Sequence, residues 1–409
     1  MNERTYRVLL ACYGGGHVQS LIPIARVLQD DPQVMLTVLG FTTARATFER
    51  AGIKAKGYTV LEGYLTHSCA ELVEPFIVGA SHPDVSKVET RAYFKVGLHD
   101  LIEAHGRDEA LRLVGEQGRV AFQPELTFRR YLEATFPDLV ITSTSPRSEL
   151  ALQRAARAVG IPGLAVSDLF LQHEAAYLCT GKYAPHISVI AEYVANFLRG
   201  EGCSQTQLHV TGNPAFDGLF NVAARTAGQR IRDRFQLNGE IRLITWIGTP
   251  NEVSLRGKPF VRNTEIIEHL DTFCDAHPGY KFAFRPHPNR SIDFPDNCRH
   301  GLLLGNEFSI EGVLWASDVV VLETSTVGLQ AALIGRPVIT INSDSYPPYA
   351  ALGLAKDVPD LNVLDDALMD LRSPCLERLG PAGLGDATAR VLRIIDELLG
   401  RNPDLEVDI

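Results

Sequence analysis

The sequence has 409 residues, a hydrophobic content of 45% and a charged content of 22%, which is typical of a globular protein with two domains. Its net charge of −10 and the lack of a long basic block exclude nucleic acid as an expected partner. No apolar run is long enough for a transmembrane segment, and the first residues lack a signal-peptide pattern, so we expect a cytoplasmic protein.

Cysteine and histidine spacing bears on redox state and metal binding. Seven cysteines are scattered without a Cys-x-x-Cys pair, which predicts reduced thiols. No His-x-x-x-His motif or cysteine cluster indicates a tightly bound metal. The Gly-x-x-x-x-Gly-Lys-Ser/Thr phosphate loop is missing as well, which argues against the common kinases and ATPases. We therefore expect neither a metal nor a cofactor.

A glycine turn follows the first predicted strand, residues 7–11, and precedes an amphipathic helix. Gly14, Gly15 and Gly16 leave a bare backbone that an acceptor or a diphosphate can approach closely. His17 closes this turn, where an imidazole could act as a general base or donate to a phosphate oxygen, or else cap the helix. The spacing differs from Gly-x-Gly-x-x-Gly, and no acidic residue follows the next strand, 34–40, which disfavours a nicotinamide cofactor.

Further along the first domain, residues 61–135 combine loops with helical patterns at 70–78, 98–114 and 126–134, and we interpret them as helical decoration that forms part of an acceptor pocket. A second strand-helix-strand unit follows. Asp168 comes directly after its second strand, 163–167, and is a candidate general base or a turn former. Residues 187–190 are predicted to be the last strand of this domain.

The pattern breaks around residues 200–204, which we interpret as a linker, and the strand at 207–210 then leads into the second domain. We predict an N-terminal acceptor domain at 1–200, a C-terminal donor domain at 206–385, and a helix and tail at 386–409. Buried β-branched strands alternate with helices in both domains. The predicted fold class is therefore α/β, with two doubly wound Rossmann-like domains facing a cleft.

Donor-binding candidates follow the strands of the second domain. Arg285 offers several N–H groups that can hydrogen-bond to phosphate oxygens, unless it is a structural arginine. His287 can add another N–H group or transfer a proton. Glu323 can accept from the hydroxyls of a ribose or a sugar, or it can cap its own helix. The predicted donor-binding residues are Gly248, Thr249, Asn251, Arg285, His287, Glu323, Thr324, Ser325 and Thr326.

These motifs resemble those of the GT-B superfamily of nucleotide-sugar enzymes. Residues 14–17 are similar to the glycine turn and histidine of MurG-like glycosyltransferases. Residues 209–217 are similar to a segment of UDP-N-acetylglucosamine 2-epimerases, which share the fold. Residues 285–288 and 323–327 look like the donor-site signature of glycerophosphotransferases and capsule transferases. The resemblance implies that His287, Ser325 and Thr326 contact the donor diphosphate.

Three segments differ from the epimerases. Those enzymes carry Gly-Thr-Arg-Pro-Glu, His-Gly-Asp-Thr and Thr-His-Arg-Arg-Glu-Asn where this chain has residues 13–17, 142–145 and 247–252. The resemblance therefore favours a metal-independent glycosyltransferase that moves a sugar from a nucleotide diphosphate-sugar to an unidentified acceptor. UDP is favoured over CDP as the nucleotide, and His17 or Asp168 would be the base. The alternatives are an epimerase-like enzyme and a nucleotide-sugar-binding protein without turnover. The sequence gives no indication of the oligomeric state.

Overall fold

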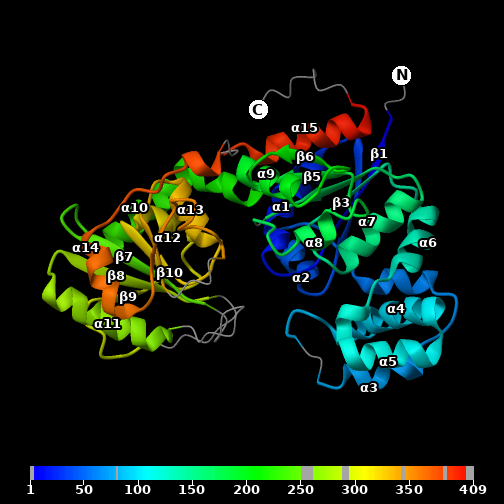
Figure 1. The fold of residues 1–409 in the computed structure, drawn as a ribbon, viewed down its shortest axis with the longest axis horizontal. Helices are drawn as coiled ribbons and strands as arrows, with labels where there is room; N and C mark the ends of the chain where they lie inside the picture. The colour runs from blue at the N-terminus through cyan, green and yellow to red at the C-terminus, as the bar shows by residue number, and fades with distance from the viewer. Residues whose placement is uncertain are drawn as a thin grey trace. The chain divides into compact units, whose positions relative to one another are not determined.

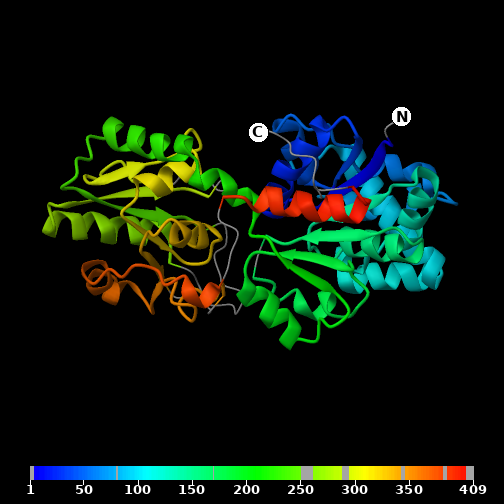
Figure 2. The ribbon, with the colours of Figure 1, turned by 90° about the horizontal axis from the view of Figure 1, so that it is seen from above.

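The computed structural model describes residues 4–79, 82–168, 170–249, 261–287, 294–341, 346–380 and 385–401 (Figures 1 and 2). The chain forms two compact units. The first comprises Met1–Ala215 together with Asp386–Ile409, and the second comprises Phe216–Gly385. Each unit contains a parallel six-stranded sheet, so the predicted α/β class with two Rossmann-like domains is confirmed. No helix of the described ranges is long and apolar enough to cross a membrane.

The sheet of the first unit has the strand order β2-β1-β3-β4-β5-β6, and all its neighbours are parallel. Its central strands are buried because helices cover both faces, which explains their continuous apolar runs. The strands are β1 (Tyr6–Cys12), β2 (Val34–Gly40), β3 (Leu139–Thr142), β4 (Gly163–Val166), β5 (His186–Val189) and β6 (Gln207–Val210). The helices that connect them include α1 (His17–Asp30), α2 (Thr43–Arg50), α7 (Ser148–Ala158), α8 (Ala175–Leu178) and α9 (Glu192–Gly200).

Two segments at the predicted domain borders belong to the first unit. Strand β6 pairs with β5 and completes the first sheet, so its placement in the second domain was wrong, and the predicted linker at 200–204 instead connects α9 to β6. Helix α15 (Ala387–Leu399) returns from the end of the chain and packs against the same unit (Figures 1 and 2). Its buried Val391 and Ile395 share a hydrophobic core with Val8 and Leu10 of β1.

A disulfide joins Cys179, which follows α8, to Cys203, which precedes β6. The expectation that all seven cysteines are reduced thiols was therefore wrong for this pair. Its two residues are 24 positions apart, but the connections around β5 bring their Cα atoms to 4.2 Å. Sequence spacing could not indicate this pairing, because it depends on how the strands are ordered in the sheet.

A helical cap is inserted between β2 and β3. It contains the 3-10 helix η1 (Tyr58–Tyr64), α3 (Ala70–Ile77), α4 (Lys87–His105), α5 (Arg107–Gln117) and α6 (Glu125–Thr135). The predicted helix at 98–114 is two helices, because Gly106 between α4 and α5 has a φ of 79°, which favours glycine and ends α4. The cap packs through aromatic side chains, and the rings of Phe41 and Tyr58 stack with centroids 4.7 Å apart.

The second unit repeats the architecture with the strand order β12-β11-β10-β7-β8-β9, again fully parallel. The strands are β7 (Arg242–Ile247), β8 (Tyr280–Arg285), β9 (Gly301–Leu303), β10 (Val319–Leu322), β11 (Val338–Ile341) and β12 (Lys356–Val358). The helices are α10 (Val222–Arg234), α11 (Asn263–Ala276), α12 (Ile310–Ala316), α13 (Val327–Leu333) and α14 (Leu364–Met369). Trp246, Phe282 and Phe284 fill the core on one face of the sheet.

Two helical glycines of the cap give a matched test of this packing. Gly97 in α4 is buried, and a methyl group there would overlap the ring of Phe122, so Gly97→Ala should lower the free energy of unfolding by about 1–3 kcal/mol. Gly115 in α5 is exposed with open space around it, so Gly115→Ala should raise it by about 0.5–1 kcal/mol through helix propensity. Urea unfolding of both variants measures the difference, and equal effects would contradict the close contact.

Candidate functional site

The glycine turn lies at the carboxyl edge of the first sheet. Strand β1 ends at Cys12 and α1 begins at His17, so the turn spans the four residues between them. Gly15 has a φ of 81°, which a residue with a side chain rarely adopts. A Cβ atom on Gly16 would lie 3.4 Å from the carboxylate of Asp168, an ordinary van der Waals contact, so the backbone of the turn passes close to this side chain. The predicted turn is therefore a place where the backbone comes close to a functional group.

His17 and Asp168 form one pair, although the sequence offered them as alternatives. The His17 Nδ1 lies 2.8 Å from Asp168 Oδ1, because β1 and β4 end at the same edge of the sheet. Asp168 is buried, and its backbone carbonyl accepts a hydrogen bond from the side chain of Asn213. With Nδ1–H directed at the carboxylate, Nε2 is the ring nitrogen left for a ligand. Asp168 thus orients the imidazole and stabilises its positive charge.

The electrostatics of this pair favour a protonated histidine. Burial disfavours the imidazolium and lowers the pKa of His17, but the charge and the hydrogen bond of Asp168, helped by Glu149 and Glu174, raise that pKa to about 9. At neutral pH the ring can therefore donate a proton to an anionic oxygen. It can accept a proton from a hydroxyl only in the minor neutral fraction, which grows as the pH approaches 9.

Glu149 fixes the glycine turn through hydrogen bonds, a role that the sequence analysis did not predict. Its Oε1 accepts hydrogen bonds from the Tyr13 amide at 2.6 Å and from the Ser143 hydroxyl at 2.9 Å. Glu149 belongs to α7 and is fully buried, and this burial raises the pKa of its carboxyl. An acid in the first turn of a helix is usually solvated, so the residue type gave no signal of a buried role.

In the second unit, Glu323 follows β10 and is 1% exposed. Its Oε1 accepts from the Val261 amide at 2.6 Å, and within the described residues its buried Oε2 has no hydrogen-bond partner. Burial raises the pKa of Glu323 to about 8, against the lowering effect of the Val261 hydrogen bond. The Val327 amide at the start of α13 donates to the Ser325 hydroxyl, and Glu323 accepts from Val261 instead, so helix capping does not account for Glu323. A buried acid with one unused oxygen is suited to a ligand hydroxyl.

The other predicted donor residues gather at the same edge of the second sheet. Gly248 and Thr249 follow β7, His287 follows β8 and is half-buried, and Thr324, Ser325 and Thr326 follow Glu323. Arg285 differs from the expectation of a free fork, because its guanidinium donates to the carbonyls of Leu304 and Gly305. Burial lowers its pKa. Asn251 lies outside the described residues.

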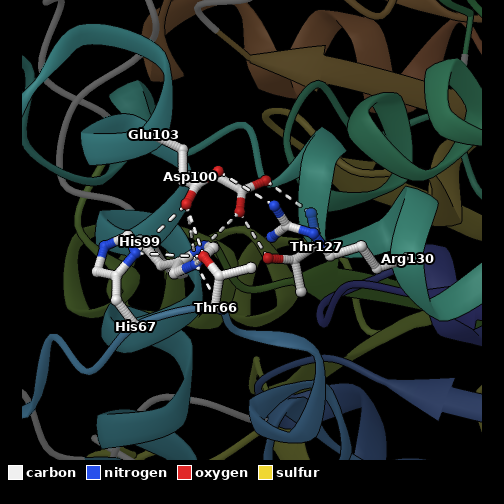
Figure 3. A network of polar contacts seen from close by, with 7 residues as sticks. All are labelled: Thr66, His67, His99, Asp100, Glu103, Thr127 and Arg130. Atoms are coloured by element: carbon white, nitrogen blue, oxygen red, sulfur yellow. Dashed lines mark hydrogen bonds and ion pairs between the residues drawn. The ribbon is translucent and has the colours of Figure 1, made fainter.

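A separate polar cluster in the cap contains His67, His99 and Glu103, whose nitrogen and oxygen atoms lie within 4.8 Å of one another (Figure 3). This set has the chemistry of a metal site, with Asp100 2.9 Å from Nδ1 of His99. However, the Thr66 amide donates to Nε2 of His99 at 3.0 Å and so uses the lone pair that a metal would need. We interpret the cluster as a polar tie that holds the loop after η1 to α4.

Comparison with protein-family models and with curated sequences gives no match. Solved structures do match. The UDP-GlcNAc 2-epimerase of Methanocaldococcus jannaschii aligns over 96% of this chain and 99% of its own, with a TM-score of 0.58 and 14% identity. The UDP-GlcNAc 2-epimerase of Neisseria meningitidis, solved with UDP-GlcNAc, aligns over 96% and 100%, with the same TM-score and identity. A calicheamicin glycosyltransferase aligns over 98% and 100%, with a TM-score of 0.55 and 14% identity.

These matches include epimerases and a glycosyltransferase, two of the classes that the motifs resemble. The chain therefore has the GT-B fold, as predicted from the sequence. At this identity the likeness establishes the fold, and the particular activity has to be argued from the site.

The His17–Asp168 pair predicts a defined effect on the histidine titration. Asp168→Asn removes the charge that raises the pKa of His17, so the midpoint should fall well below the wild-type value of about 9. The sign for stability follows: a raised histidine pKa contributes stability that is fully present below about pH 6.5 and is lost as the pH rises through 9. NMR titration of the His17 ring protons measures the midpoint, and an unchanged midpoint in Asp168→Asn would contradict the pair.

Glu323 predicts a pH effect in the second unit. Its folded-state pKa of about 8 exceeds the unfolded value of about 4.3, so its contribution to stability is present below pH 4.3 and is lost as the pH rises through 8. Glu323→Gln keeps an acceptor for the Val261 amide but cannot ionise. The stability of this variant relative to wild type should therefore increase between pH 5 and pH 9. Parallel curves in urea unfolding across that range would show that the carboxyl titrates normally.

Proposed function

We propose that this protein is a glycosyltransferase that moves a sugar from a UDP-sugar to a hydroxyl group of an acceptor. The observation that carries the proposal is that the glycine turn, which leads into the His17–Asp168 pair, also borders a cavity of about 870 Å³ in the first unit. Tyr13, Gly14 and Gly15 of the glycine turn line this cavity, which lies between the turn and the helical cap. An epimerase or a sensor that handles one nucleotide-sugar has no need of a second binding space next to a base.

In the proposed reaction, Nε2 of His17 takes the proton of the acceptor hydroxyl while its oxygen attacks the anomeric carbon of the donor sugar. The bond from that carbon to the β-phosphate oxygen breaks, and the diphosphate leaves with the bonding electrons. Asp168 stabilises the imidazolium as it forms. Because the pKa of His17 is about 9, the neutral base is the minor form at pH 7, and the rate should increase toward pH 9.

The donor is assigned to the second unit. Glu323 offers its unused Oε2 to a hydroxyl of the nucleotide ribose, and with a pKa of about 8 it can also donate while protonated. The diphosphate is assigned to His287, Ser325 and Thr326. The part of the donor site next to the diphosphate is assigned to Gly248 and Thr249. The structural neighbour from Neisseria meningitidis that was solved with UDP-GlcNAc supports the choice of UDP. Arg285 receives a supporting role, since it holds the loop after β9.

A UDP-GlcNAc 2-epimerase-like activity is the second candidate. Epimerases of the same fold match with TM-scores of 0.58 to 0.60, against 0.53 and 0.55 for two glycosyltransferases. An epimerase converts its nucleotide-sugar without any acceptor, so the two activities differ in their products. A binding protein without turnover would release neither an epimer nor UDP.

Incubation with UDP-glucose and UDP-N-acetylglucosamine, with and without a panel of hydroxyl compounds, tests these functions. We expect acceptor-dependent UDP release with kcat/KM that rises toward pH 9. His17→Ala should lower kcat by about 10²–10⁴-fold through loss of the base, with the Kd of UDP unchanged. Glu323→Ala should instead weaken UDP binding by about tenfold in calorimetry, through loss of a hydrogen bond to a charged or buried group.

The outcomes separate the candidates. A C2 epimer detected by NMR in the absence of acceptor would replace the transferase with the epimerase. UDP binding with neither product would leave a sensor. No binding of any UDP compound would overturn the nucleotide-sugar function as a whole.

A further inference from the structure

The cavity in the first unit has aromatic walls. It opens to solvent and is bordered by the glycine turn, by the start of α2, by α4 and by the ends of α3 and α5. Tyr58, Tyr93, Phe76 and Phe94 line it, and their rings pack against one another, with centroids 4.9 Å apart for Tyr58 and Tyr93 and 6.3 Å for Phe76 and Phe94. A volume of about 870 Å³ is within the range of sites that enclose a drug-sized molecule.

Most polar groups in these walls already have partners within the protein. Glu89 accepts from the Tyr58 amide at 2.7 Å, from the Thr59 hydroxyl at 2.6 Å and from Arg45 at 3.0 Å. The Tyr58 hydroxyl lies 2.6 Å from that of Ser148. The Thr90 hydroxyl donates to the Ser86 carbonyl, and the Tyr13 hydroxyl accepts from Arg147. A ligand with many hydroxyls, such as a sugar, would therefore find few unpaired groups along this part of the wall.

Tyr93 is the buried polar group of the wall that stands out. It is 6% exposed, its neighbour Arg147 lies close enough to act on its pKa, and in the described part of the chain no group meets the geometry of a hydrogen bond to its hydroxyl. Burial raises the pKa of Tyr93 to about 12, so the group remains a neutral phenol that can donate and accept. Buried hydroxyls normally find a partner, and this one lies in the wall of a cavity. One oxygen of a ligand would satisfy it.

We propose that the cavity binds the acceptor, and that the acceptor is a flat aromatic or fused-ring alcohol or phenol with a second oxygen that pairs with Tyr93. This inference rests on the proposed glycosyltransferase function and adds the acceptor class. The reacting hydroxyl lies at the end formed by Gly14 and Gly15, in the turn that leads to His17 at the start of α1. The ring system occupies the space between the four aromatic side chains, where offset or edge contacts between rings are favourable.

The titration uses 2,6-dihydroxynaphthalene and 2-naphthol as probes, with N-acetylglucosamine for comparison, and no nucleotide present. Val85 lines the cavity from a half-exposed loop, so Val85→Trp should fill it and weaken both naphthols by about tenfold or more. Val88 lies three residues later, is 62% exposed and does not line the cavity, so Val88→Trp is the matched control and should change binding less than about twofold.

Tyr93→Phe keeps the ring and removes only the hydroxyl. It should weaken 2,6-dihydroxynaphthalene by about 3–10-fold, the worth of one hydrogen bond, and change 2-naphthol much less, since that probe uses its single hydroxyl at the glycine turn. A purely structural role of Tyr93 would affect both probes equally. Thermal unfolding of each variant checks that the fold is kept.

The inference is overturned if N-acetylglucosamine binds more tightly than the naphthols, or if Val85→Trp and Val88→Trp bind the naphthols alike. It is also overturned if the naphthols bind but accept no sugar from a UDP-sugar that the protein transfers to another acceptor. Failure of the proposed function has a different signature, because the naphthols would then bind while no UDP compound does.

Discussion

The structure depends on the burial of both faces of its two parallel sheets. The strands β3, β4, β10 and β11 are buried at every residue, and their backbone groups are paired within the ladders. A charged side chain in such a layer would lose its hydration without compensation. Charged groups can therefore appear only where a strand ends, and parallel strands end together. This constraint collects the glycine turn and Asp168 at one edge of the first sheet and Glu323 at one edge of the second.

Three buried carboxyls at these edges show how the partners decide the chemistry. Asp168 faces an imidazole and raises that ring's pKa to about 9. Glu149 accepts from Tyr13 and Ser143 and feels the charge of His17, and it serves to hold the turn. Glu323 has one amide donor among the described residues, and burial raises its own pKa to about 8. The same functional group thus orients an imidazole, holds a turn, or keeps its proton at neutral pH, because burial is similar and the neighbours differ.

The sequence predicted those parts of the fold that depend on local pattern. Strands such as β1 and β10 are continuous apolar runs, and the turns after them carry glycine or hydroxyl residues. Strand β6 was assigned to the wrong domain because the sequence of a short edge strand with polar residues does not indicate which sheet the strand joins. The His17–Asp168 pair joins residues 151 positions apart, so each was visible as a candidate but their contact was not. The carbonyl partners of Arg285 were equally hidden, since they belong to a loop 19 and 20 residues away.

The helical cap explains why the acceptor could not be predicted from the sequence. The aromatic residues that line the cavity have the spacing of ordinary core residues, and they do pack as a core among themselves. Only the three-dimensional arrangement shows that this core is incomplete, with space left beside the glycine turn and one tyrosine hydroxyl without a partner among the described residues. The tie between Thr66 and His99 connects the loop after η1 to α4, the helix that carries Tyr93 and Phe94. Selectivity for the acceptor can therefore change through cap residues such as Val85 and Tyr93, while the strand-end residues that perform the chemistry stay in place.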